Sequence, residues 1–231
     1  FSRMRRVVSC RSRACGARLR PQYGLRSHCG ALSSLGWRGI FHRVEYYDRV
    51  FGDLGPGEVL EWYDIDWELL KPFVLERMPD AGILVDVGCG TSSFCHQAGQ
   101  WNSSWRVVGL DVSATAIARQ RERTGSCTFV EASATALPFG DEAADVLLEK
   151  GMLEALRSSK AMEQTSLEIV AEAYRVLKTG GRFVSVSHQS NYDVFLSRAA
   201  PWTEVSRHEL RSSQSSQVFL YSCDKSCSQA A

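Results

Sequence analysis

The sequence lacks a long apolar run, a zinc-binding motif and any acidic residue in its first 44 positions. No apolar stretch approaches the about 18 residues that a membrane-spanning helix needs, so we expect no membrane span. Eight cysteines are present, but no CxxC pair or Cys/His spacing of a zinc site occurs. We therefore expect no structural metal and a reducing compartment.

Residues 1–44 differ in composition from the rest of the chain. They contain ten arginines and no lysine, aspartate or glutamate, so the remainder carries about nine more acidic than basic side chains. An arginine-rich, serine-containing segment without acids is typical of organelle transit peptides. We predict that residues 1–44 are a mitochondrial transit peptide outside the fold. The alternatives are a plastid or cytoplasmic location, and a disordered basic arm that touches nucleic acid or an acidic partner.

Residues 45–225 alternate short β-branched runs with helical patterns, which predicts βαβ units in one domain. The expected strands are Ile83–Val87, Arg106–Asp111, Cys127–Glu131, Ala144–Glu149 and Arg182–Ser187. The expected helices are Ser92–Gly99, Ser113–Arg123 and Lys160–Leu177. Gly180 and Gly181 are predicted to end the last helix, because helix C-termini favour glycine.

The C-terminal part predicts an antiparallel closure of the sheet. A helix near Tyr192–Arg198 precedes two runs, Trp202–Leu210 and Gln217–Cys223, which a polar Ser/Gln turn separates. Such runs pair as a hairpin at a sheet edge. The predicted fold is therefore α/β and Rossmann-like: a doubly wound, seven-stranded, mostly parallel sheet with an antiparallel C-terminal hairpin and a tail at 226–231.

A glycine turn follows the first of these strands and opens a helix. Gly88 and Gly90 let backbone N–H groups approach a ligand there, but Ser93 stands where a dinucleotide-binding GxGxxG motif needs glycine. A pyrophosphate beside Asp86 would also be repelled, by about 4 kcal/mol at ~4 Å. S-adenosylmethionine instead carries a sulfonium and an ammonium, which favour this carboxylate. We predict this cofactor.

Asp111 ends the second strand 23 residues after Gly88, where an acid can accept both ribose hydroxyls. Two structural alternatives stay open. Asp86 could cap the helix that follows it, and Asp111 could be the N-cap of the helix near Ser113.

These motifs resemble the class I methyltransferases, with Asp86–Ser92 as motif I and Ala132–Phe139 as the loop beside adenine. Further stretches are similar to the group that contains elongation-factor lysine methyltransferases and the mitochondrial citrate synthase lysine methyltransferase: Tyr46–Arg49, Glu61–Tyr63 and Leu148–Ala155. This chain departs from the usual residues of these relatives at four positions, where it has Tyr47 for Trp, Ser133 for Asp, Met152 for Thr and Glu154 for Asp.

The resemblance implies a cofactor site. Three aromatic residues would fold over the cofactor: Tyr47, Phe51 and Trp62. The residues that would line it, with Asp86 and Gly90 of the turn, are Gly88, Asp111, Val112, Ser133, Ala134 and Lys150. We predict Glu149, at the end of the fourth strand, as the catalytic acid that orients an acceptor amine, with Glu154 or His188 as alternatives.

The function implied is methyl transfer to a lysine side chain of a protein substrate. Nucleic acid is not an expected partner, because Glu149–Gly151 stands where base-amino methyltransferases carry an Asn/Asp-Pro-Pro-aromatic run. Two alternatives remain: a small-molecule, quinone-type methyltransferase, and a non-catalytic assembly factor on the same fold.

Overall fold

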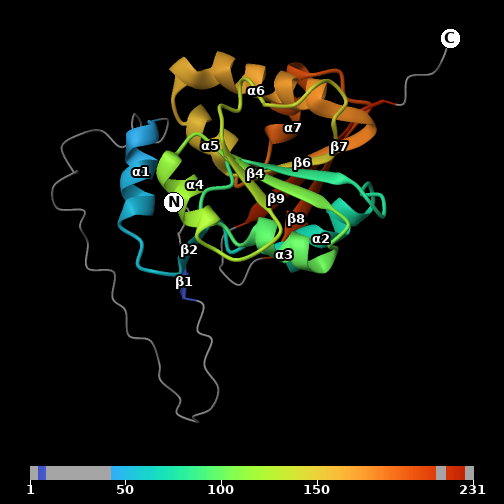
Figure 1. Cartoon of the computed structure of the whole chain (residues 1–231). Helices are drawn as coiled ribbons and strands as arrows, with labels where there is room; N and C mark the ends of the chain where they lie inside the picture. Colours follow the sequence, from blue (N-terminus) through green and yellow to red (C-terminus); the bar gives the residue numbers. More distant parts are fainter. Residues whose placement is uncertain (1–4, 9–42, 212–216, 227–231) are drawn as a thin grey trace.

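The computed structural model describes residues 5–8, 43–211 and 217–226. Seven strands form one sheet in the order β5-β4-β3-β6-β7-β9-β8 (Figure 1). Five of them run parallel: β3 (Ile83–Val87), β4 (Arg106–Asp111), β5 (Thr128–Glu131), β6 (Ala144–Lys150) and β7 (Leu177–Ser187). The last two strands, β8 (Glu204–Leu210) and β9 (Val218–Asp224), form the antiparallel hairpin, with β9 against β7. The predicted fold class is confirmed.

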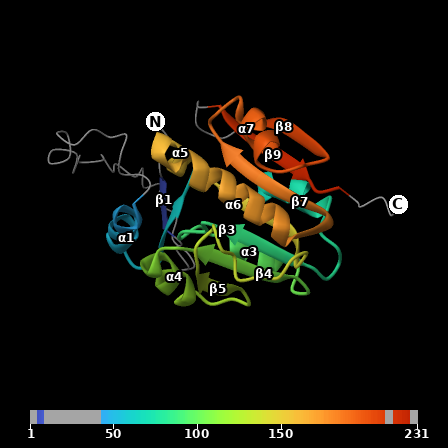
Figure 2. The same cartoon turned by 90° about the horizontal axis from the view of Figure 1, so that it is seen from above.

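Helices cover both faces of the sheet, as Figures 1 and 2 show. One face carries α2 (Trp67–Leu75), α3 (Phe94–Trp101) and α4 (Ala114–Arg121). The other carries α5 (Met152–Arg157), the short η3 (Lys160–Met162), α6 (Glu163–Val176) and α7 (Tyr192–Ala199). Because the central strands are buried on both faces, they read as continuous apolar runs. No helix in the described part of the chain is long and apolar enough to cross a membrane.

The long helix ends within one residue of its predicted end, but Gly180 and Gly181 do not terminate it. Helix α6 ends at Val176, and Leu177 already pairs with Ala144 as the first residue of β7. Gly180 lies inside this strand with φ +80°, where the ladder between β6 and β7 shifts register. Glycine at this position permits the irregularity in the strand and does not cap the helix.

The predicted exclusion of residues 1–44 also needs correction. Backbone pairing joins β1 (Arg5–Val8) to β2 (Glu58–Glu61) in a separate antiparallel pair, with Arg5 opposite Glu61. Helix α1 (Val44–Gly52) begins one residue before the predicted domain boundary and packs on α4. Most of the remaining predicted leader lies outside the described residues.

Candidate active site

A pocket of about 240 Å³ opens at the carboxyl ends of β3, β4, β5 and β6. Strand order reverses between β3 and β6, which is where open α/β sheets bind ligands. All the predicted cofactor-binding residues except Asp86 lie on its wall: Tyr47, Phe51, Trp62, Gly88, Gly90, Asp111, Val112, Ser133, Ala134 and Lys150.

The glycine turn is shaped by its backbone. Gly88 and Gly90 both have positive φ values, +73° and +49°. The N–H groups of Gly88 and Cys89 donate to the Leu110 carbonyl at 2.7 and 2.9 Å, which ties the turn to the end of β4. A Cβ atom on Gly88 would lie 2.9 Å from Met152, so the position has room for glycine alone.

Asp111 lies at the tip of β4 and faces the pocket. Its carboxylate accepts hydrogen bonds from the N–H groups of Gly90 and Ser113, each at 2.8 Å. Burial raises the pKa of Asp111 above its usual value, against these two hydrogen bonds. Ser113, not Asp111, caps α4, because the Ser113 hydroxyl accepts from the Ala116 N–H at 3.1 Å. Asp111 is thus available to a diol, and the capping alternative is wrong.

Asp86 lies behind the pocket instead of on its wall. Its side chain is 2% exposed and accepts a hydrogen bond from the Cys95 thiol at 3.6 Å. Burial raises the pKa of Asp86 to about 7. It does not cap α3 either, because the Ser93 N–H at that helix start donates to Glu61. The structure therefore does not support direct contact between Asp86 and a ligand.

Glu149, the predicted catalytic acid, is also withdrawn from the pocket wall. It is fully buried, accepts hydrogen bonds from the Ser185 hydroxyl and, at 3.1 Å, from the Leu153 N–H, and so holds the start of α5. Burial raises the pKa of Glu149 to about 7. Successive strand residues point to opposite sides, so Lys150 lines the pocket while Glu149 does not.

A buried ion pair that the sequence did not reveal connects β2 to this pocket. The Lys150 ammonium lies 2.5 Å from Glu61 Oε2, and the two side chains are 5% and 8% exposed. Lys150 also donates to the Ile65 carbonyl at 2.8 Å. Glu61 accepts further hydrogen bonds from the Ser92 hydroxyl and from the N–H and hydroxyl of Ser93.

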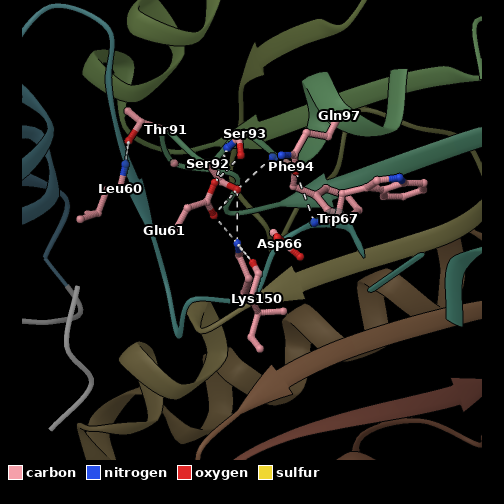
Figure 3. Close-up of polar contacts among 12 residues, drawn as sticks. Leu60, Glu61, Asp66, Trp67, Thr91, Ser92, Ser93, Phe94, Gln97 and Lys150 are labelled. Atoms are coloured by element: carbon pink, nitrogen blue, oxygen red, sulfur yellow. Dashed lines mark hydrogen bonds and ion pairs between the residues drawn. The ribbon is translucent and has the colours of Figure 1, made fainter. Parts of the chain in front are cut away.

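Two further hydrogen bonds join β2 and the start of α2 to the glycine turn and α3. The Leu60 N–H donates to the Thr91 hydroxyl at 3.0 Å, and the Trp67 N–H donates to the Gln97 side chain at 3.3 Å (Figure 3). Burial would raise the pKa of Glu61, but the Lys150 ammonium and the Ser93 hydrogen bonds hold it below its usual value. Glu61 is therefore an anion that fixes the turn and neutralises Lys150.

Three aromatic side chains line the pocket. The Tyr47 ring stacks on Phe51 with centroids 6.0 Å apart and lies 6.5 Å from the Trp62 ring. A Cβ atom on Gly90 would lie 3.1 Å from Phe51, which places this ring directly over the glycine turn. The Tyr47 hydroxyl is buried and has no hydrogen-bond partner among the described residues. It is a donor left for a ligand.

The adenine-side wall combines predicted and unpredicted residues. Ser133 is exposed, and its hydroxyl pairs with that of Thr135 at 2.8 Å. Other residues on the wall, from α1, α5, η3 and α6, were not predicted as cofactor residues: Val44, Met152, Leu156, Met162, Thr165 and Ile169. All of them except Thr165 are apolar, which suits a flat heterocycle.

Comparisons with known proteins agree with the fold and the pocket. Residues 85–185 match the family model described as a methyltransferase domain. A S-adenosylmethionine-dependent methyltransferase from Methanosarcina mazei superposes with a TM-score of 0.55 at 16% identity, covering 67% of this chain and 97% of that one. The match to a methyltransferase domain and the shared fold make this chain similar to class I S-adenosylmethionine-dependent methyltransferases.

Two curated relatives are named as lysine methyltransferases. The eEF1A lysine and N-terminal methyltransferase of Mus musculus is 30% identical over 156 residues, 64% of this chain but 22% of that protein. The EEF1A lysine methyltransferase 4 of Mus musculus is 28% identical over 162 residues, 64% of this chain and 61% of that protein. The cyclase SpnF shares the fold with a TM-score of 0.54 at 19% identity, over 68% of this chain and 80% of that one. The fold therefore does not fix the reaction.

Proposed function

We propose that this chain transfers a methyl group from S-adenosylmethionine to the amine of a lysine side chain in a protein. The observation that carries this proposal is the placement of residues 148–155. This stretch resembles lysine methyltransferases, and Lys150, Gly151, Met152 and Ala155 from it form one wall of the pocket. The names of the curated relatives support the same acceptor.

The pocket fits the cofactor. The Asp111 carboxylate suits the ribose diol, the positive-φ turn admits a close backbone approach, and the rings of Tyr47 and Trp62 offer π faces to a cation. When bound, S-adenosylmethionine supplies a methyl group already activated by its sulfonium. The residues of the chain then position the reactants and exclude water.

A lysine acceptor must lose its proton before it can attack. At pH 7.4 the neutral form lies about 4 kcal/mol above the ammonium for an ordinary pKa of ~10.4. A site that removes the amine from water reduces this difference, because desolvation disfavours the ammonium. Catalysis by this chain therefore depends on how the acceptor is held beside the pocket.

The test is incubation of the purified chain with S-adenosylmethionine labelled in its methyl group, recombinant eEF1A and a mitochondrial extract. We expect label in protein, and mass spectrometry should place it on lysine. Asp111→Ala is the matched control and should give no label. Label confined to extractable metabolites would favour a small-molecule acceptor. No label, together with no thermal stabilisation by millimolar cofactor, would favour a non-catalytic factor.

We also propose that the arginine-rich residues 1–44 direct the protein to mitochondria. The ten arginines and the absence of acids support this address. A fluorescent protein fused after residue 44 should accumulate in mitochondria. Replacing the arginines by glutamine should leave it diffuse, and plastid or diffuse fluorescence of the unaltered fusion would contradict the proposal.

A further inference from the structure

A second polar site adjoins the cofactor pocket on the far side of Gly151. Gly151 lines the pocket, and a Cβ atom on it would lie 2.8 Å from the Tyr63 hydroxyl. Tyr63, Glu154, Ser187 and His188 meet there, and we refer to these four residues as the Tyr63 cluster. The cluster lies at the carboxyl ends of β6 and β7.

Glu154 uses only one of its two oxygens inside this cluster. Oε2 accepts hydrogen bonds from the Tyr63 hydroxyl at 2.9 Å, the Ser187 hydroxyl at 2.7 Å and the His188 N–H at 2.8 Å. Oε1 has no donor among the described residues, and the residue is partly exposed. A carboxylate held so firmly by one oxygen presents the other in a fixed direction.

His188 supplies a second acceptor. Its Nδ1 lies 2.7 Å from the Gln217 carbonyl, and a carbonyl only accepts hydrogen bonds, so Nδ1 carries the proton. In the neutral ring, Nε2 is then a lone-pair acceptor. The imidazole and the Tyr63 ring pack edge to face, with centroids 4.5 Å apart, so His188 and Glu154 both contact the same tyrosine.

The backbone at Tyr63 is strained in order to reach this arrangement. Tyr63 and Asp64 are consecutive non-glycine residues with φ values of +65° and +56°. Left-handed residues of this kind persist where the surrounding structure requires them, often at functional sites. The turn aims Trp62 at the cofactor pocket and Tyr63 at Glu154.

We propose that the Tyr63 cluster binds the ammonium group of the acceptor, an inference that rests on the proposed function. Glu154 Oε1 accepts a hydrogen bond from the ammonium, and His188 Nε2 takes one of its protons. The imidazole becomes an imidazolium as the amine becomes neutral, so charge is conserved. The amine lone pair is then free to point past Gly151 into the cofactor pocket. Tyr63 is a positioning residue, because it acts through Glu154.

The variant Glu154→Gln separates this role from a structural one. The three donors on Oε2 fix the carbonyl end of the amide there, so the NH₂ group takes the place of Oε1 and faces the ammonium as a second donor. We expect the thermal midpoint and the affinity for S-adenosylmethionine to stay at wild-type values. The kcat/KM for the protein labelled by wild type should fall by about 30-fold or more.

A binding measurement gives a readout independent of turnover. Butylammonium, the end of a lysine side chain, should bind the complex with S-adenosylhomocysteine, and Glu154→Gln should weaken it by about tenfold or more. Glu68→Gln is the matched control: it makes the same replacement at an exposed carboxylate of α2, outside the Tyr63 cluster, so binding should change by less than about threefold. Butan-1-ol, which carries no charge, should not distinguish wild type from Glu154→Gln.

His188→Gln tests the proton acceptor separately, because its backbone N–H still reaches Glu154. We expect butylammonium binding to persist and kcat to fall. The inference is overturned if wild type and Glu154→Gln bind butylammonium equally, or if wild type does not bind it. Either result counts even when wild type methylates protein. If Glu154→Gln lowers the thermal midpoint instead, an unchanged kcat in His188→Gln would overturn the inference.

Discussion

Removing one member of the Glu61–Lys150 pair should destabilise the protein strongly, because the remaining charge stays buried without its partner. At the 2.5 Å separation of their charged atoms, the attraction is about 7 kcal/mol at an effective dielectric constant of 20, before desolvation is subtracted. Both side chains are almost fully buried, so a lone survivor cannot recover its hydration. Breaking such a pair by losing one partner costs about 3–5 kcal/mol.

The two single variants should differ. After Lys150→Met, the Glu61 carboxylate still accepts three hydrogen bonds from Ser92 and Ser93. After Glu61→Leu, the ammonium keeps only the Ile65 carbonyl and the Ser92 hydroxyl, both neutral. We therefore expect a loss of about 4 kcal/mol for Glu61→Leu and about 2 kcal/mol for Lys150→Met.

The double variant decides whether the pair acts as a unit. Glu61→Leu with Lys150→Met should cost about 3 kcal/mol, which leaves a coupling of about 3 kcal/mol between the two sites. Urea unfolding followed by tryptophan fluorescence at pH 7.5 measures all four proteins. Losses that simply add would refute the reasoning. The Glu61 pKa is lowered by folding, so the coupling should also fade as the pH falls through that pKa.

Three further variants test the site. Asp111→Ala should abolish thermal stabilisation by the cofactor with the unliganded midpoint retained, and undiminished affinity would remove Asp111 from the site. Trp62→Ala should weaken binding of cofactor and acceptor, whereas a loss of stability alone would make Trp62 a packing residue. The Asp86 pKa of about 7 exceeds its unfolded value, so wild-type stability should decline as the pH rises from about 4 to 7. Asp86→Asn should flatten that decline in urea midpoints; an unchanged slope would contradict the burial argument.

The sequence predicted the strands better than the helix ends. β3 and β4 begin and end at the predicted residues, because each is an apolar run bounded by turn residues. The role of Gly180 and Gly181 was mispredicted because two glycines after a helical pattern look like a helix stop. Pairing of Leu177 with Ala144 overrides that local preference, and no local pattern reports a contact with another strand.

The pocket wall was predictable where a motif fixes a backbone shape. The positive φ of Gly88 and the strand-end position of Asp111 follow from residue type and spacing. Glu61 could not be found in this way. A buried Lys150 requires an anion, but 26 acidic residues are available and the pairing spans 89 positions of sequence.

The two misassigned acids share one cause. Asp86 and Glu149 lie near the carboxyl ends of strands, and that position predicts the correct edge of the sheet but not the direction of the side chain. Because neighbouring strand residues point to opposite sides, Glu149 lies beneath α5 and Lys150 faces the pocket. A shift of the strand by one residue would exchange these two orientations. The acid that remains for an acceptor is then one on α5 itself, because Glu154 is partly exposed whereas Asp86 and Glu149 are buried, and its Oε1 has no donor among the described residues.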